Sequence, residues 1–321
     1  MTHHDPPETA VVHFTISAPR SGSTWLAKAL GQHPEILSTE NRLFGRFFEL
    51  WKNQQGKTVP RITADEFITG LSRHTFYQSL GFETANELAT DLFSEFQTFL
   101  INYLQAKSGK SVIVDKITPY LGTSQRVVNS VRSRPHSRII HLIRDGRDVA
   151  VSGVFDWIAR EDKSSKRYQM FVERDPQLTL KRFFDDELLE RWAHYWKEPI
   201  AALTPAQPST LQVHYEKMLD NQAGVLEKIF EHLGVAADPK IANMCSEAVT
   251  FEKLTGRPSG QAKLLAKARK GTSGDWKNYF TKQDAKKFQA CTGNLLQELG
   301  YEPDDSWIHA CPEHLELTAD F

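Results

Sequence analysis

The segment Val11-Val12-His13-Phe14-Thr15-Ile16-Ser17-Ala18-Pro19-Arg20-Ser21-Gly22-Ser23-Thr24-Trp25-Leu26 decides the fold of this chain. It opens with a short apolar run rich in β-branched residues, continues as a loop of small polar residues, and leads into an amphipathic stretch over residues 24–32. A helix that begins directly after such a loop directs its unpaired backbone N–H groups toward the space in front of it. The segment therefore predicts a strand, an anion-binding loop and a helix in succession.

The side chains of this loop suit the same purpose. Gly22 lets the backbone approach a ligand closely, and Arg20 can bind a phosphate through two parallel hydrogen bonds. Ser21, Ser23 and Thr24 add hydroxyl donors. The loop is not the nucleotide-triphosphate P-loop G-x-x-x-x-G-K-[ST], because the Gly–Lys pair is missing. Taken by itself, it is also compatible with an ordinary strand-to-helix turn.

Further apolar, β-rich runs occur at residues 111–114, 138–143 and 211–215, and stretches with helical periodicity separate them. Continuous apolar runs indicate strands that are buried on both faces, as in a parallel sheet. Helices are predicted over residues 24–32, 85–105, 123–131, 148–157, 180–197 and 222–233. This alternation predicts an α/β fold with a central parallel sheet flanked by helices.

The composition is that of an ordinary globular chain. Of 321 residues, 40% are hydrophobic and 25% are charged, and Lys+Arg 39 against Asp+Glu 40 leave a formal net charge of -1. These values exclude a collagen-like or disordered chain and give no support to nucleic-acid binding. The chain has three cysteines, an odd number, and they lie far apart in the sequence. Neither a disulfide framework nor a cysteine-rich zinc site is therefore expected.

The ends and the hydropathy of the chain predict where it works. Residues 1–10 show no signal-peptide pattern and are expected to be disordered. No stretch is apolar enough to span a membrane. The chain is therefore expected to be cytoplasmic, with one domain over residues 11–321.

Two later segments place more cations where a strand end or a loop would present them. The first, Arg144-Asp145-Gly146-Arg147-Asp148-Val149-Ala150-Val151-Ser152, follows the run at 138–143. Its first residue would emerge at the end of a strand, and its last lies about two helical turns further on. The second, at 267–278, combines adjacent cations with glycines and a tryptophan. This composition predicts a flexible basic loop that can fold over a phosphate.

In this order, the segments resemble the cofactor-binding motifs of the sulfotransferases that use 3′-phosphoadenosine 5′-phosphosulfate (PAPS). P-R-S-G-S-T-W at residues 19–25 resembles the 5′-phosphosulfate loop, and the Arg144 to Ser152 segment resembles the 3′-phosphate motif. Residues 269–278 are similar to the R-K-G-x-x-G-D-W-K-N signature, and residues 215–218 to the Y-E-x-[LM] segment beside the adenine. The resemblance covers about residues 11–281. It implies a P-loop-like fold, PAPS as cofactor and sulfuryl transfer.

The resemblance also assigns residues to parts of the cofactor. Those implied to hold the 5′-phosphosulfate are Arg20, Ser21, Gly22, Ser23 and Thr24. Those implied to hold the 3′-phosphate are Arg144, Ser152, Arg269, Lys270 and Gly271. Tyr215 and Trp25 would lie near the adenine, with Phe251 as a weaker candidate. Many relatives carry Lys at position 20, whereas Arg cannot donate a proton at neutral pH. Arg20 is therefore expected to act by electrostatic stabilisation.

The group that takes the proton from the acceptor is not fixed by the sequence. Glu40 is the preferred candidate, because its segment resembles that of the carbohydrate-type and bacterial branch, whose Glu is the base. Asp115 and the histidines His33 and His141 are the alternatives, although His141 is expected to be packed within a strand. Lys116 resembles the second cation of the same branch and is expected to face the transferred group.

The acceptor itself cannot be read from the sequence. Insertions at about 43–80 and 158–185 are expected to act as lid or acceptor walls, since loops decide acceptors in this family. A hydroxyl of a small molecule or a carbohydrate is the expected acceptor, an amine is less favoured, and a homodimer is left open. The transferred group carries less charge than a γ-phosphoryl, so metal-independent chemistry is expected. A P-loop nucleotide kinase and a non-catalytic PAPS-binding protein are the competing interpretations.

Overall fold

A parallel sheet of five strands forms the centre of the protein in a computed structural model, with the order β2-β3-β1-β4-β5. The structure describes residues 11–39, 78, 81, 83–132, 134, 136–161, 164–204, 207–263, 266 and 269–319. The strands are β1 (Val11–Ser17), β2 (Ile36–Thr39), β3 (Val112–Ile117), β4 (Ile139–Ile143) and β5 (Thr210–His214). The predicted α/β class and parallel sheet are thus confirmed.

The strand predictions differ from the structure at β3, β2 and β5. Strand β3 continues to Ile117, three residues beyond the predicted run at 111–114. The edge strand β2 was not predicted, because it is short and half of it, Ser38 and Thr39, is polar. The run at 211–215 ends one residue early, since Tyr215 is the first residue of α9 (Tyr215–Asp220). The differences at β3 and β5 lie at the carboxyl ends of these strands.

The helices surround the sheet and extend beyond it. Those before residue 205 are α1 (Ser23–Leu30), α4 (Ala85–Ser108), α5 (Ser124–Arg132), α6 (Gly146–Glu161), α7 (Lys166–Phe171) and α8 (Asp186–Leu203). Those after α9 are α10 (Gln222–Leu233), α11 (Pro239–Ala248), α12 (Phe251–Thr255), the 3-10 helix η1 (Asp275–Asn278), α13 (Lys282–Thr292), α14 (Leu295–Glu298) and α15 (Ser306–Ala310). Among the described residues, no helix is both long enough and apolar enough to cross a membrane.

The helix predicted over 180–197 is shifted in the structure. Helix α8 begins at Asp186 because the side chain of Asp185 caps it, accepting the N–H of Leu188 at 2.8 Å. Residue Leu180 instead forms an isolated antiparallel bridge with Leu317. The apolar periodicity predicted a helix in this part of the chain, but it did not predict the Asp185 cap, which fixes the first turn of α8.

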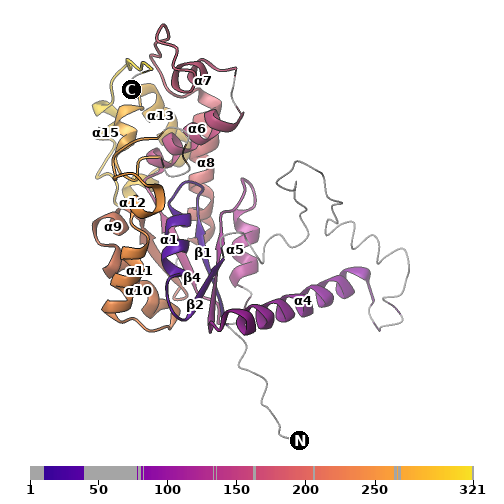
Figure 1. Ribbon diagram of the computed structural model, residues 1–321. Helices are drawn as coiled ribbons and strands as arrows, with labels where there is room; N and C mark the ends of the chain where they lie inside the picture. Colours follow the sequence, from indigo (N-terminus) through magenta and orange to yellow (C-terminus); the bar gives the residue numbers. More distant parts are fainter. Residues whose placement is uncertain are drawn as a thin grey trace, which may run out of the picture.

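Both faces of the sheet are covered by helices (Figure 1). On one face, Leu26 of α1 and Phe230 of α10 belong to the same buried cluster as Ile140 of β4. On the other face, residues of α5 and α8 pack with Phe14 of β1. Neighbouring side chains of β3 alternate between these clusters, with Ile113 in the second, as the pleat of a strand requires. Coverage of both faces explains why the central strands β1, β3 and β4 are mostly apolar.

A second, aromatic core lies beyond the sheet and joins α6, α7 and α8 to the C-terminal helices. Phe171 of α7 is buried there, with its ring centroid 5.3 Å from that of Phe155 on α6. The segment predicted as an insertion at 158–185 therefore contributes to this core through α7. Residues 1–10 and nearly all of the predicted insertion at 43–80 lie outside the residues that the structure describes.

The contact between α6 and α8 makes a testable prediction at Gly153. A Cβ at this position would lie 2.2 Å from the indole of Trp192, which is buried on α8. Gly→Ala within a helix normally stabilises by about 0.5–1 kcal/mol, but here overpacking should outweigh that gain. Gly153→Ala is expected to lower the free energy of unfolding by about 1–3 kcal/mol, measured by urea denaturation.

A second substitution tests whether the indole is the cause. In a Trp192→Phe background the smaller ring leaves room, so Gly153→Ala should cost clearly less than in the natural sequence. An equal cost in both backgrounds, or no cost at all, would show that the two helices do not meet as described.

Candidate anion-binding site

The loop between β1 and α1 is built for close approach to a ligand. Arg20 and Gly22 have positive φ angles of 69° and 89°, so the chain turns sharply before α1 begins at Ser23. A Cβ at Gly22 would lie 2.6 Å from the ring of Tyr215, so glycine is required there for space as well as for conformation. The hydroxyl of Ser21 is buried and has no hydrogen-bond partner among the described residues. The loop thus offers helix N–H groups and a buried hydroxyl to an anion.

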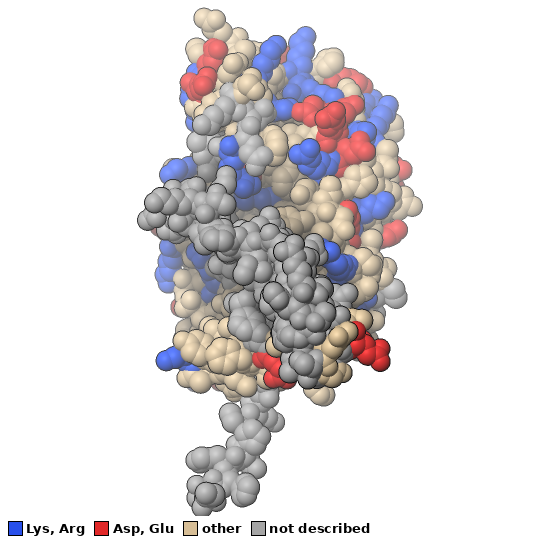
Figure 2. Space-filling view, turned by 90° about the vertical axis from the view of Figure 1, so that its right-hand side faces the viewer, with Lys and Arg blue, Asp and Glu red and all other residues tan. Residues whose placement is uncertain are grey.

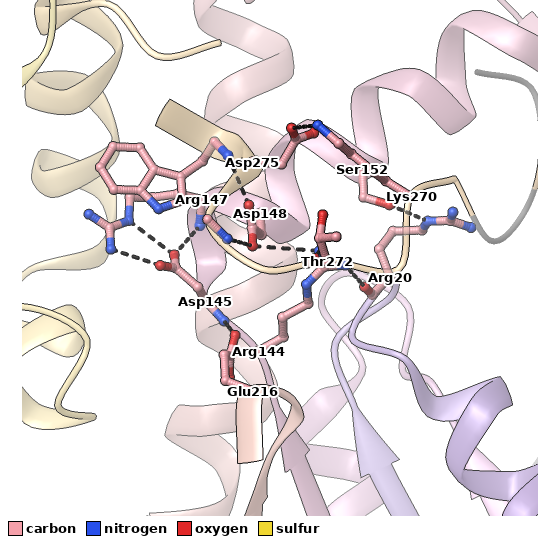
Figure 3. Close-up of polar contacts among 12 residues, drawn as sticks. Arg20, Arg144, Asp145, Arg147, Asp148, Ser152, Glu216, Lys270, Thr272 and Asp275 are labelled. Atoms are coloured by element: carbon pink, nitrogen blue, oxygen red, sulfur yellow. Dashed lines mark hydrogen bonds and ion pairs between the residues drawn. The ribbon is translucent and has the colours of Figure 1, made fainter. Parts of the chain in front are cut away.

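Arg144 follows β4 and connects this loop to a distant part of the chain. Its Nη1 donates to the backbone oxygen of Arg20 and its Nη2 to that of Thr272, each at 3.1 Å (Figure 3). The guanidinium lies 4.6 Å from the ring centroid of Tyr215. The end of β4 therefore holds together two loops that are far apart in the sequence.

The side chain of Arg20 lies along one face of α6. Its Nε donates to the hydroxyl of Ser152 at 3.1 Å, and its Nη1 pairs with the carboxylate of Asp156 at 3.3 Å. Burial lowers the pKa of Arg20, Asp156 raises it, and the charges of Arg144 and Arg269 lower it further. Because Arg144 and Arg269 both lower the pKa of Arg20, these positive charges lie close enough to repel one another. A bound anion would offset this repulsion.

The predicted basic loop reaches the same region. Lys270 Nζ pairs with Asp275 at 2.7 Å, and Arg269 pairs with the other oxygen of that carboxylate. Burial alone would raise the pKa of Asp275, but these two cations hold it below its usual range. Gly271 has a φ of 69°, and a Cβ there would lie 2.4 Å from the ring of Phe251. The loop is thus folded tightly, with its cations held by an acidic partner.

Asp148 joins the loop to the beginning of α6, a role that the sequence did not reveal. Its carboxylate is buried and accepts the backbone N–H groups of Gly274 at 2.8 Å and of Trp276 at 2.9 Å. It also pairs with Arg144, one helical turn before it, at 3.5 Å. The i,i+4 spacing of Arg144 and Asp148 was the signal present in the sequence, but the loop contacts had none.

Arg147 fastens the C-terminal part of the chain to the same helix start. It forms a bidentate ion pair with Asp145 and a second pair with Glu302. Its guanidinium lies 3.7 Å from the ring centroid of Trp276 and 4.7 Å from that of Trp307. A charge this deeply buried is stable only with such partners, so Arg147 is read as structural.

The two predicted site residues on β3 have different surroundings. Lys116 Nζ donates to the hydroxyl of Thr24 at 3.0 Å, which places this cation beside the loop as expected. Asp115 is fully buried and accepts the hydroxyl of Thr39, its neighbour on β2, at 2.5 Å. The carboxylate of Asp115 is therefore buried beside the end of β2, and its role as base stays a prediction.

Of the remaining predicted residues, one lies beside the loop, two are buried histidines, and one is not described. Trp25 lies beside Tyr215, with ring centroids 5.7 Å apart, and its indole donates to the backbone oxygen of Val249. His33 is buried against the backbone oxygen of Ala236 at 2.9 Å. Burial lowers the pKa of His141 to about 3, in agreement with its predicted packing in a strand. Glu40, the preferred base, lies outside the described residues.

The charge of this site is local. On the face drawn in Figure 2, lysines and arginines are interspersed with acidic side chains in the upper part of the molecule. The arginines of the site are instead mostly buried, with side-chain exposures of 13% for Arg20, 12% for Arg144 and 7% for Arg269. Solvent therefore screens the charges of the site only weakly.

Comparisons with known proteins agree on one family. The model of a family described as the sulfotransferase family matches residues 13–239. Sulfotransferase 2A6 of Mus musculus is 28% identical over 195 residues, 56% of this chain and 64% of that protein. Sulfotransferase 2A1 of Homo sapiens is 30% identical over 178 residues, 52% of this chain and 59% of that protein. The matches thus span less than two thirds of these curated relatives.

Solved structures of similar fold are also sulfotransferases. The mouse sulfotransferase SULT7A1 complexed with PAP has a TM-score of 0.49 at 16% identity, over 94% of this chain and 88% of that one. A sulfotransferase domain from the curacin biosynthetic pathway has a TM-score of 0.43 at 20% identity, over 74% of this chain and 77% of that one.

The structural role of Arg147 can be tested by stability. Arg147→Met keeps most of the side-chain volume but leaves Asp145 and Glu302 without their partner, so we expect a loss of about 3–5 kcal/mol in the free energy of unfolding. The same substitution at Arg160, whose ion pair with Asp156 is largely exposed, serves as control and should change it by less than about 0.5 kcal/mol. Equal effects of the two substitutions would mean that Arg147 is not buried among its partners.

Proposed function

Because this chain belongs to the sulfotransferase family, we propose that it transfers a sulfuryl group from PAPS to a hydroxyl of a small-molecule or carbohydrate acceptor. The observation that carries the proposal is that Arg144, at the end of β4, donates to backbone oxygens of both the loop before α1 and the basic loop. PAPS has two anionic ends, a 5′-phosphosulfate and a 3′-phosphate, and the cations of this site come from two loops that Arg144 connects.

The residues present fit such a cofactor. The Ser21 hydroxyl and the Nε atoms of Arg144 and Arg269 are buried and without hydrogen-bond partners among the described residues. Buried polar groups of this kind are normally satisfied, so a ligand with several acceptor oxygens would complete them. Bound PAPS supplies the reaction with a sulfuryl group on a phosphate leaving group.

Each part of the site has a proposed task. Arg20 and Lys116, with the loop from Ser21 to Thr24, would hold the 5′-phosphosulfate and stabilise the charge that develops there. Arg144 and Ser152 would hold the 3′-phosphate together with Arg269, Lys270 and Gly271. Trp25 and Tyr215, whose rings are adjacent, would flank the adenine.

We further propose Glu40 as the base that takes the acceptor proton. The proposal is supported by the place of Glu40 in the sequence, one residue after Thr39. Strand β2 ends at Thr39, and because the sheet is parallel, its carboxyl end lies on the same side of the sheet as that of β1. Asp115, the alternative carboxylate, is buried and accepts the hydroxyl of Thr39, which supports Glu40 rather than Asp115 in this role. Metal-independent chemistry and a cytoplasmic location are proposed on the sequence alone, as is the possibility of a homodimer. A nucleotide kinase would need the Gly–Lys pair that the loop lacks.

The assignment of Arg144 predicts a split between binding and turnover. Its contact with a distal phosphate should be alike in the ground and transition states, so Arg144→Ala should raise the KM for PAPS far more than it lowers kcat. Loss of a charged hydrogen bond predicts an effect of about 10- to 100-fold on KM, measured by steady-state kinetics. A large fall in kcat with unchanged KM would contradict the assignment.

The assignment of Glu40 predicts the opposite split. Glu40→Gln keeps the size of the side chain and removes its basicity, so turnover should fall by about 10²- to 10⁴-fold. The affinity for adenosine 3′,5′-bisphosphate, measured by calorimetry, should hardly change. The acidic limb of the pH–rate profile should also disappear, because it reports deprotonation of the base. Near-normal turnover of Glu40→Gln would transfer the role to another group.

A further inference from the structure

Asp148 holds the two parts of the chain that are assigned to the 3′-phosphate. Its Oδ2 accepts the N–H of Gly274 and its Oδ1 that of Trp276, which are 126 and 128 residues away in the sequence. The same carboxylate pairs with Arg144 at 3.5 Å. One buried side chain thus aligns a guanidinium at the end of β4 with the basic loop (Figure 3).

Hydrogen bonds from two sides hold the basic loop. The backbone oxygens of residues 269–271 are bound by residues 257–263, through Arg257 Nη1, Lys263 N–H, Gly260 N–H and Ser259 Oγ. Residues 272–276 are bound from the other side, by Arg144 and by Asp148. Lys270 and Gly271 are therefore fixed between two sets of contacts, and Asp148 provides most of the second set.

The charge of Asp148 makes its effect on an anion informative. A carboxylate so close to Arg144 repels a bound phosphate by Coulomb's law. However, each of its oxygens is already engaged by a backbone N–H, so it aligns Arg144 and the loop for a ligand. Removing the charge should tighten phosphate binding if repulsion dominates, and weaken it if alignment dominates.

We propose that Asp148 is the positioning residue through which this chain recognises the 3′-phosphate of its nucleotide and rejects nucleotides without one. The proposal rests on the proposed function and adds to it the residue that sets cofactor specificity. Asp148 acts through Arg144 and the loop at 269–276 and does not touch the ligand itself.

The test compares two nucleotides on three proteins by calorimetry. Dissociation constants are measured for adenosine 3′,5′-bisphosphate and adenosine 5′-monophosphate, and their ratio gives the preference for the 3′-phosphate. In Asp148→Asn an NH₂ group replaces one carboxylate oxygen and cannot accept a hydrogen bond from the backbone N–H that faces it. One contact with the loop is therefore lost, together with the charge that aligns Arg144. We expect the natural chain to prefer the bisphosphate, and Asp148→Asn to reduce that preference by about tenfold or more, as for loss of a charge-assisted contact.

Asp284→Asn is the matched control. Asp284 is also fully buried, accepts a backbone N–H from Thr281 at 2.9 Å and pairs with Arg182 at 2.6 Å. Its replacement should destabilise the fold in a similar way and leave the nucleotide preference unchanged. A merely structural role of Asp148 would make the two variants alike.

The outcomes separate this proposal from the function on which it rests. An unchanged or increased preference in Asp148→Asn would overturn the role of Asp148. A natural chain without any preference for the bisphosphate would overturn the proposed function. If Asp148→Asn does not fold, Gly274→Ala decides by the same criterion, because its φ of 79° disfavours alanine while its Cβ would meet open space. We then expect a smaller loss of the preference for the bisphosphate. A preference that does not change at all would contradict the proposal.

Discussion

The structure depends on how a buried guanidinium at the end of β4 is satisfied. Arg144 cannot lose its charge in a protein, and a buried charge needs partners that water no longer supplies. Those partners are backbone oxygens at residues 20 and 272 and the carboxylate of Asp148. The loop before α1, the start of α6 and the basic loop must therefore lie where Arg144 can reach all three. The shape of the anion site follows from this requirement.

The acidic side chains around the site moderate its attraction for anions. Asp156 pairs with Arg20, and Asp275 pairs with Arg269 and Lys270. An incoming anion exchanges partners with these carboxylates and gains only the difference between two ion pairs. A simple anion gains little from such an exchange, whereas a ligand that satisfies several cations at once gains much. Selectivity for a ligand with two charged ends is a natural result.

The sequence predicted the strands, the fold class and the cationic members of the site, because these depend on local pattern. Both faces of β1, β3 and β4 are covered, so most of their residues are apolar. The polar edge strand β2 and the start of α8 at its Asp185 cap were missed. Asp148 could not be predicted, since its partners Gly274 and Trp276 come close only in the folded chain. Asp115 was an alternative to Glu40 as the base, and its contact with Thr39 could not be predicted, because it depends on the pairing of β2 with β3.

The position of β1 at the middle of the sheet sets the order in which a growing chain can complete the molecule. The first residue of β1 pairs with Val112 of β3, and the other neighbour of β1 is β4, which begins at Ile139. During synthesis β1 therefore has no partner strand until about a hundred further residues have been made. Parallel pairings between such distant segments form slowly. The contact of Asp148 with Trp276 must wait longer still. The anion site can therefore form only after residue 276 has been made, and the newly made chain cannot bind its ligand before that point.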